Sequence, residues 1–192
     1  MRGSDVADAT LSEAIALHQR VRDAGLGSTT AAALAIVASL RQGGTVWVFG
    51  NGGSAADAAH AAAELVGRFR RERRGYAAVA LTADPSVLTS IANDYGFDRI
   101  FARQIEALGR PGDVALAITT SGESANAVAG LEAARAQKLT TIALTGRDGG
   151  AAGRIADIHV NVPSESTPRV QEVHRTLLHV ICDLVETDLT EQ

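Results

Sequence analysis

The sequence is poor in cysteine, in aromatic residues and in net positive charge. Its one cysteine, Cys182, has no intrachain partner, which excludes a disulfide scaffold. Aromatic residues make up only 4% of the 192 residues, too few for the stacking platforms that bind single-stranded nucleic acid. The formal net charge is -4, and no half of the chain is basic. We therefore expect no nucleic-acid partner.

Long apolar runs are also missing. No run reaches the roughly 18 apolar residues that a membrane span requires. Charged residues such as Asp5, Asp8 and Glu13 interrupt the first apolar stretch, which argues against a secretory signal. With 46% hydrophobic and 21% charged residues, the composition is that of a compact folded chain. We expect a cytoplasmic protein without a membrane partner, in which residues 1–192 form one domain.

Hydrophobic periodicity divides the chain into helical and strand-like segments. Two helices are expected near the N-terminus, within about residues 4–42. Short runs rich in Val, Ile, Leu and Ala then predict strands at 45–49, 77–81, 114–119, 140–144 and 158–162. Helices are expected between and after them at 55–69, 86–93, 101–108, 124–137 and 168–189. This alternation predicts an α/β fold with a parallel sheet covered by helices on both faces, a three-layer sandwich.

A glycine-rich loop follows the first predicted strand, with the sequence Gly50-Asn51-Gly52-Gly53-Ser54. Its glycines permit a tight turn, and Ser54 is the expected cap of the next helix, so free amides would face an anion or a sugar. The alternative is an ordinary strand-to-helix turn. The loop also fits the G-x-G-x-x-A dinucleotide fingerprint, but no acidic residue ends the second strand to hold a ribose, which disfavours a nucleotide-binding oxidoreductase.

A loop rich in hydroxyl groups follows the third predicted strand. Its side chains and the amides of the next helix would converge on a phosphate dianion without a lysine. The hydroxyl-bearing residues are Thr119, Thr120, Ser121 and Ser124. Ordinary helix capping is the alternative interpretation. Glu123 lies in the same loop and would repel a phosphate unless it points outward.

The helix after the glycine loop carries a polar stripe on an alanine background. Asp57, His60, Glu64 and Arg68 follow spacings that place them on one face. A solvated helix face is the alternative, because His and Glu four residues apart are common there.

The last predicted helix has an apolar seam and a polar arc. The seam is expected to be buried and contains Val170, Val173, Leu177, Ile181 and Leu184. The polar arc contains Gln171, Arg175, His179, Cys182 and Glu186. His60, Glu64 and His179, with the amide oxygen of Gln171, offer nitrogen and oxygen ligands suited to zinc. Gln171 and His179 lie about 12 Å apart along an ideal helix, so both could bind one ion only by leaning toward each other.

Taken together, these motifs resemble those of the phosphoheptose isomerases, a family of the sugar isomerase (SIS) domain superfamily. The resemblance spans nearly the whole chain. The matching segments are Gly50–Asp57 with His60 and Glu64, Ala92–Phe97, Thr120–Ser124, Leu144–Gly150 and Arg169–His174 with His179. Glu123 and Thr119 depart from the residues common in the family, which are Asn and Ser. The set of His60, Glu64, Gln171 and His179 narrows the resemblance from SIS domains in general to this family.

The resemblance implies a five-stranded parallel sheet of flavodoxin-like order in a homotetramer, with active sites near subunit interfaces. The N-terminal helices, within about residues 4–42, are expected to pack on the core and on partner subunits. It implies one zinc ion per subunit, held by His60, Glu64, Gln171 and His179. By the same likeness, Thr119, Thr120, Ser121 and Ser124 would hold the substrate phosphate. The sugar would contact Asn51, Gly52, Gly53, Ser54, Glu64, Asn93, Asp94 and Gln171.

The implied reaction is the aldose–ketose isomerisation of sedoheptulose 7-phosphate to D-glycero-D-manno-heptose 7-phosphate, which feeds nucleotide-activated heptose biosynthesis. Such a reaction needs a base that moves a proton between C1 and C2 through an enediol. We predict Glu64 as this base and His179 as the group that handles the hydroxyl protons. The main alternative is a non-catalytic SIS protein of the replication-initiator-associating type. The presence of all four of His60, Glu64, Gln171 and His179 favours the enzyme.

Overall fold

A computed structural model describes residues 3–190 and contains one parallel sheet whose strand order is β2-β1-β3-β4-β5. The strands are β1 (Val46–Gly50), β2 (Ala78–Ala80), β3 (Val114–Thr119), β4 (Thr140–Gly146) and β5 (Ile158–Val162). All neighbouring strands pair in parallel. This arrangement confirms the predicted α/β class and the flavodoxin-like order.

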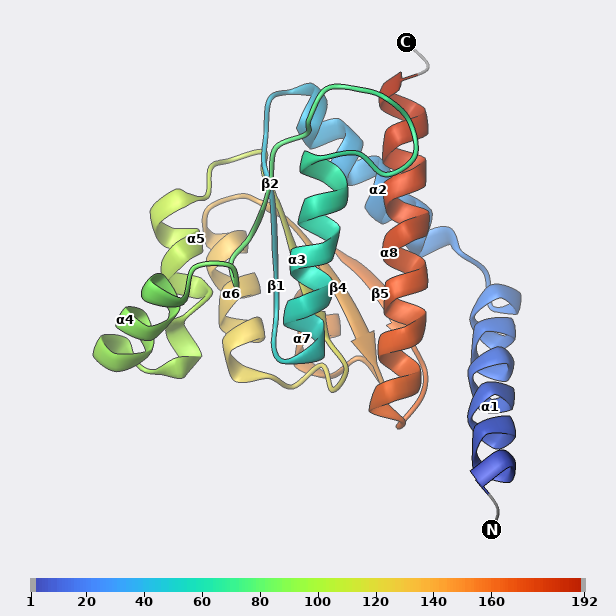
Figure 1. Cartoon of the computed structure of the whole chain (residues 1–192). Coiled ribbons are helices and arrows are strands. Elements are labelled where there is room, and N and C mark those ends of the chain that lie inside the picture. Colours follow the sequence, from blue (N-terminus) through green and yellow to red (C-terminus); the bar gives the residue numbers. More distant parts are fainter. Residues whose placement is uncertain (1–2, 191–192) are drawn as a thin grey trace.

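Helices cover both faces of the sheet, as the sequence predicts (Figure 1). One face carries α1 (Gly3–Asp23), α2 (Gly27–Arg41), α3 (Gly53–Val66) and α8 (Thr167–Thr190). The other carries α4 (Pro85–Tyr95), the 3-10 turn η1 (Phe97–Arg99), α5 (Ala102–Leu108), α6 (Ala125–Ala136) and α7 (Gly150–Ile155). Helices α3 and α8 therefore share a layer although they lie far apart in the sequence.

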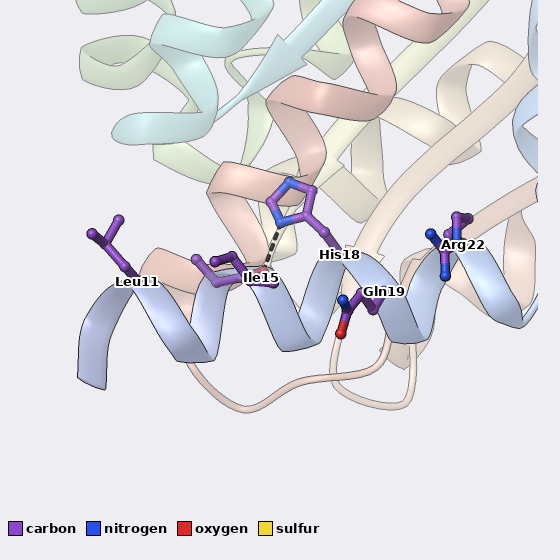
Figure 2. Close-up of a pocket in the computed structure, with 6 residues that line it drawn as sticks. Leu11, Ile15, His18, Gln19 and Arg22 are labelled. Atoms are coloured by element: carbon purple, nitrogen blue, oxygen red, sulfur yellow. Dashed lines mark hydrogen bonds between the residues drawn. The ribbon is translucent and has the colours of Figure 1, made fainter. Parts of the chain in front are cut away.

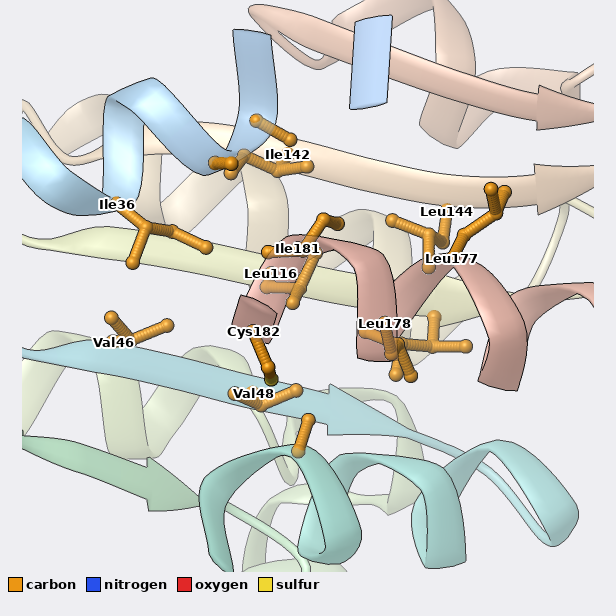
Figure 3. Packing of buried hydrophobic residues seen from close by; sticks show 14 of the residues in the cluster. Ile36, Val46, Val48, Leu116, Ile142, Leu144, Leu177, Leu178, Ile181 and Cys182 are labelled. Carbon is orange, nitrogen blue, oxygen red and sulfur yellow. The ribbon is translucent and has the colours of Figure 1, made fainter. Parts of the chain in front are cut away.

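Alternation along β1 shows why the sheet is buried on both faces. Val46 and Val48 pack toward α2, α3 and α8, whereas Trp47 and Phe49 pack toward α5 and α6. Figure 3 shows Val48 beside Cys182 of α8 within the first of these clusters. Cys182 is 4% exposed, and burial raises the pKa of its thiol to about 12.

Three local expectations differ from the structure. Helix α3 ends at Val66 rather than residue 69, so Arg68 lies beyond the helix and off the predicted stripe. Helix α7 begins at Gly150, in a segment where the glycine pair obscures the helical pattern. Leu184 is 37% exposed, and Val185 is buried in its place, because the seam drifts around the 24-residue helix α8.

The N-terminal helices differ in how they pack. Helix α2 contributes a row of buried residues to the core, while α1 stands along the side of the body and buries only Leu17 and Val21 (Figure 1). Within residues 3–190, no single helix is long and apolar enough to cross a membrane; α1 and α2 pass that test only as a pair bent by 74°.

Candidate functional site

The loops after β1 and β3 meet at the point where the strand order reverses. Strand β1 lies between β2 and β3, so the chain leaves β1 toward one edge of the sheet and leaves β3 toward the other. The side chains of Asn51 and Asn126 join the two loops, each donating an amide N–H to the other's oxygen at 2.8 and 2.9 Å. Sequence reasoning missed Asn126, which lies inside an alanine-rich helix and is 2% exposed.

The glycine-rich loop allows a close backbone approach. A Cβ at Gly50 would lie 2.5 Å from the carbonyl oxygen of Ile118 on β3, so only glycine fits there. Gly52 has φ 55° and occupies the cap position of α3, without a side-chain cap. The expectation that Ser54 caps this helix is therefore wrong: Ser54 lies within the first turn and is 3% exposed.

The hydroxyl groups after β3 gather around Thr119. Its Oγ1 lies 3.2 Å from Ser124 Oγ and 3.4 Å from Ser121 Oγ, and it accepts the N–H of Gly122. Ser124 occupies the cap position of α6 but makes no side-chain cap hydrogen bond. The alternative of simple helix capping therefore does not account for Ser124. Thr120 is half-buried beside this cluster.

Glu123 is engaged away from the hydroxyl cluster. Its Oε1 accepts the N–H of Ala151 at the start of α7 and lies 3.4 Å from Arg154 Nη2. The loop after β3 packs closely on the loop before α7, where Gly122 contacts Gly149 and Gly150. A Cβ at Gly122 would lie 2.1 Å from the Gly149 carbonyl oxygen, so only glycine allows this approach. The Glu123 charge is thus compensated locally by a guanidinium and a backbone amide.

Helices α3 and α8 run parallel and meet at three successive levels. At the first level a Cβ on Gly53 would lie 2.6 Å from Gln171 Nε2. At the second, the buried carboxylate of Asp57 pairs with Arg175, whose Nε donates to it at 3.0 Å. At the third, the rings of His60 and His179 meet. The polar stripe predicted on α3 therefore faces the polar arc predicted on α8.

The third level brings together three groups that could hold a metal ion. His60 Nε2 lies 2.8 Å from His179 Nε2 and 3.4 Å from Glu64 Oε1. The ligand atoms of these three residues all lie within 4.8 Å of one another. A tetrahedral zinc ion would separate two such nitrogens by about 3.3 Å, so a small opening of the histidine pair would admit it. Two imidazoles and a carboxylate are a fitting donor set for zinc.

Other predicted site residues lie elsewhere. Gln171 lies two levels away from the histidine pair, beside Gly53. Asn93 and Asp94 are exposed on α4, in the helical layer on the opposite face of the sheet, and Asn93 donates to Asp94 at 2.8 Å. Within one chain, the structure thus places Asn93 and Asp94 in a different layer from Glu64 and His179.

A hollow of about 420 Å³ lies outside this region, along α1. All six residues that line it belong to that helix: Leu11, Ala14, Ile15, His18, Gln19 and Arg22 (Figure 2). His18 reaches from α1 to the body, where its Nε2 lies 2.9 Å from Thr176 Oγ1 of α8. The hollow contains no predicted site residue, and it is a groove beside one helix.

Comparison with known proteins gives consistent matches. The family model described as "SIS domain" matches residues 11–146. A phosphoheptose isomerase of Roseiflexus sp. (strain RS-1) is 54% identical over 157 residues, which cover 82% of this chain and 80% of the relative. The structure resembles phosphoheptose isomerase GmhA from Neisseria gonorrhoeae with TM-score 0.90, 42% identity and coverage of 96% and 98% of the two chains. A phosphoheptose isomerase from Francisella tularensis matches with TM-score 0.94, 37% identity and coverage of 97% and 100%.

Proposed function

The chain belongs to the SIS domain family and, within it, to the phosphoheptose isomerases, and on that premise we propose that it converts sedoheptulose 7-phosphate to D-glycero-D-manno-heptose 7-phosphate. The observation that carries the proposal is the meeting of Glu64 and His179, from helices far apart in the sequence, within 4.8 Å of each other. The relatives named as isomerases favour this function over a non-catalytic SIS protein. The product would feed nucleotide-activated heptose biosynthesis.

The hydroxyl cluster is the proposed phosphate site. Thr119, Thr120, Ser121 and Ser124 would donate to the phosphate oxygens, with the first amides of α6 behind them. From Gly53 to His60 the helix rises about 10 Å, comparable to the length of an extended seven-carbon sugar phosphate. The sugar would therefore lie along α3, with its phosphate at the β3 loop and C1 and C2 at the histidine level. The sugar would contact Glu64 beside the histidine pair and, near the start of α3, Asn51, Gly52, Gly53, Ser54 and Gln171.

Proton transfer is assigned to two side chains. Glu64 would take a proton from C1 of the ketose, which yields the enediol, and would return a proton to C2. Its Oε1 faces His60, so we assign Oε2 to the carbon chemistry. Because Nε2 of His179 faces His60, its Nδ1 would give a proton to the C2 oxygen and take one back from the C1 hydroxyl, so that no net proton is gained or lost.

Zinc is the proposed cofactor, with one ion per subunit. His60, Glu64 and His179 would hold it, and Gln171 would join them if its side chain leans along α8. When bound, zinc would stabilise negative charge on the carbonyl and enediol oxygens. Glu64 then serves as ligand through one oxygen and as base through the other.

A homotetramer is the proposed assembly. Exposed apolar side chains on α1, among them Val6, Leu11 and Ile15, leave a face that a second copy could cover. Asn93 and Asp94 lie in the layer opposite α3, and a site shared between subunits would bring them to the sugar. The cytoplasmic location stays a prediction.

The direct test is incubation with sedoheptulose 7-phosphate while aldose formation is followed, with and without a chelator. The wild-type chain should turn over, and Glu64→Gln and His179→Gln should each lose at least about 100-fold in kcat, the scale of general acid–base catalysis. Asp188→Asn, on the same helix as His179 but paired with Arg41, is the matched control and should behave as wild type. Turnover that survives in Glu64→Gln would exclude Glu64 as the proton carrier.

A further inference from the structure

The segment that follows α3 is held by a buried carboxylate of α8. Glu186 is fully buried, and its two oxygens accept the backbone N–H groups of Phe69, Arg70 and Arg71 at 2.8 to 3.0 Å. Arg73 Nε lies 3.1 Å from Glu186 Oε1. Burial would raise the pKa of Glu186, but the three N–H groups and the Arg73 guanidinium outweigh it and hold that pKa below 4.5. The carboxylate is therefore ionised and fully engaged at neutral pH.

Arg73 also closes the end of α3. Its side chain is 4% exposed. Its two terminal nitrogens donate to the carbonyl oxygens of Glu64, Leu65, Gly67 and Arg74 at 2.7 to 3.0 Å. Its guanidinium also stacks over the Tyr76 ring, 4.1 Å from the centroid. The carbonyls of Glu64 and Leu65 lie in the last turn of α3 and have no partner within the helix, so Arg73 fixes that turn, which carries Glu64.

Phe69 connects the same segment to His179. Its ring centroid lies 5.4 Å from that of His179, while the His60 ring lies 5.1 Å away on an edge-on approach. The backbone N–H of Phe69 is one of the three that Glu186 holds. The position of the Phe69 ring, and with it one side of His179, therefore depends on the buried carboxylate.

We propose that Glu186 and Arg73 form a positioning pair that sets the Glu64 carboxylate against the His179 imidazole, with Phe69 as the contact to the imidazole ring. The pair acts indirectly on the Glu64 carboxylate and the His179 imidazole. The Arg73 side chain binds the backbone carbonyl of Glu64, and Glu186 binds the backbone of Phe69, whose ring contacts His179. This inference rests on the roles proposed for Glu64 and His179. It predicts that the geometry of the metal-binding group depends on two residues outside it.

The test compares Glu186→Gln and Phe69→Leu with wild type in three measurements: Zn²⁺ affinity by competition with a chromophoric chelator, kcat and KM for sedoheptulose 7-phosphate, and thermal unfolding of the metal-free chain. Loss of a group that orients a metal ligand costs about 10- to 100-fold in metal affinity or activity. We expect Glu186→Gln to lose at least about 10-fold in both Zn²⁺ affinity and kcat, with KM within about twofold because the hydroxyl cluster is untouched. Phe69→Leu should show the same pattern without a large loss of stability.

Matched variants separate positioning from general stability. Phe69→Tyr keeps the ring against His179 and should bind Zn²⁺ as wild type does, whereas Phe69→Leu should bind Zn²⁺ more weakly. Asp183→Asn removes only the surface pairs with Arg70 and Arg71 and should bind Zn²⁺ as wild type does. If Glu186→Gln does not fold, the two Phe69 variants carry the test.

The outcomes distinguish this inference from the proposed function. Equal Zn²⁺ affinity in wild type, Glu186→Gln and Phe69→Leu, or binding by none of them, would overturn the positioning role. A wild-type chain that binds Zn²⁺ but leaves the sugar phosphate unchanged would overturn the proposed function alone. In that case the affinities of the variants still decide the positioning role.

Discussion

The hydroxyl cluster and the histidines show how single residues acquire different roles from their surroundings. Thr119, Ser121 and Ser124 point their oxygens at one another, with few partners besides the loop amides. His18, His159 and His174 instead serve the fold: His18 ties α1 to α8, and the other two bind Thr145 of β4. The sequence predicted the hydroxyl cluster, because its members follow a strand, and the three histidines match no ligand pattern in the sequence.

A phosphate site at the hydroxyl cluster predicts a selective effect on substrate binding. Ser124→Ala should raise KM for sedoheptulose 7-phosphate roughly 10-fold, because a hydrogen bond to a charged group is lost, and should change kcat little. Steady-state kinetics measure both constants. Ser86→Ala, at the start of α4, is the control and should leave KM unchanged. A KM for Ser124→Ala equal to that of wild type would remove Ser124 from the phosphate site.

His174 predicts a dependence of stability on pH. It is fully buried, its Nε2 donates to the Thr145 carbonyl oxygen, and its Nδ1 has no hydrogen-bond partner among residues 3–190. Burial lowers the pKa of His174 below 6.5, although the Thr145 carbonyl and Asp57 oppose the shift. The unfolded chain therefore binds the proton more readily. The stabilising contribution is complete above about pH 6.5 and is lost as the pH falls from there toward the folded pKa.

The measurement is urea unfolding of wild type and His174→Gln between pH 7.5 and pH 5. The glutamine amide can still donate to the Thr145 carbonyl but does not titrate in this range. The free energy of unfolding should fall more steeply with decreasing pH in wild type than in His174→Gln. Parallel curves would show that His174 does not titrate differently on unfolding.

At the scale of elements, the strands and the long helices were predictable, but the ends of some helices were not. The boundaries of β3 and β5 agree with the predicted 114–119 and 158–162, because buried parallel strands are short apolar runs bounded by polar residues. Helix α3 ends three residues before its predicted end, because its end depends on Arg73, which follows seven residues later. Sequence periodicity contains no information about such a partner.

The meeting of α3 and α8 illustrates what sequence can and cannot supply for the site. Each polar stripe was visible at helical spacing, and both proved to face each other. The levels at which they meet were not predictable, because register between helices is set by packing on the sheet. The placement of Gln171 beside Gly53, and the contact of Phe69 with His179, therefore required the structure.

Alanine substitutions at two loop glycines test how closely the loops before α3 and α6 approach the rest of the chain. Gly52 and Gly122 both have positive φ, 55° and 70°. Nothing lies within 4 Å of a Cβ at Gly52, whereas one at Gly122 would lie 2.1 Å from the Gly149 carbonyl oxygen. Gly52→Ala should cost about 1 to 3 kcal/mol of stability from backbone strain alone, because φ 55° and ψ -119° lie outside the left-handed helical region. Gly122→Ala should cost at least about 2 kcal/mol more, since the α7 loop must move. Chemical denaturation measures both, and equal losses would contradict the close contact.

At the scale of the whole molecule, the strand order and the helix layers determine where the candidate site lies, and they leave α1 exposed. The sheet order sets the two loops side by side, and α3 and α8 extend one face from them toward the histidine pair. Helix α1 buries little of its apolar surface in a single chain. Composition and periodicity predicted the layers. Periodicity alone did not distinguish the exposed apolar face of α1 from a face buried in the core.

The proposed assembly predicts that charge on α1 disperses the oligomer. Leu11 is 65% and Ile15 is 59% exposed, and both line the groove along the helix. Leu11→Glu with Ile15→Glu should convert a tetramer to smaller species in sedimentation equilibrium, because charges would have to be buried at the interface. Ser12→Glu, on the same helix outside that groove, should leave the tetramer intact. An unchanged tetramer in the double variant would place the interface elsewhere.

The central claim is that Glu64 carries a proton between two carbons of the sugar, and isomerisation in D2O tests it most directly. Sedoheptulose 7-phosphate is incubated with wild type and with Glu64→Gln, and deuterium at C2 of the aldose is followed by NMR. We predict that wild type places solvent deuterium at C2 through the enediol and that Glu64→Gln places almost none. Solvent deuterium enters to the extent that the proton on Glu64 exchanges before it returns to C2. Formation of the aldose by Glu64→Gln at the wild-type rate, with or without deuterium at C2, would contradict the account.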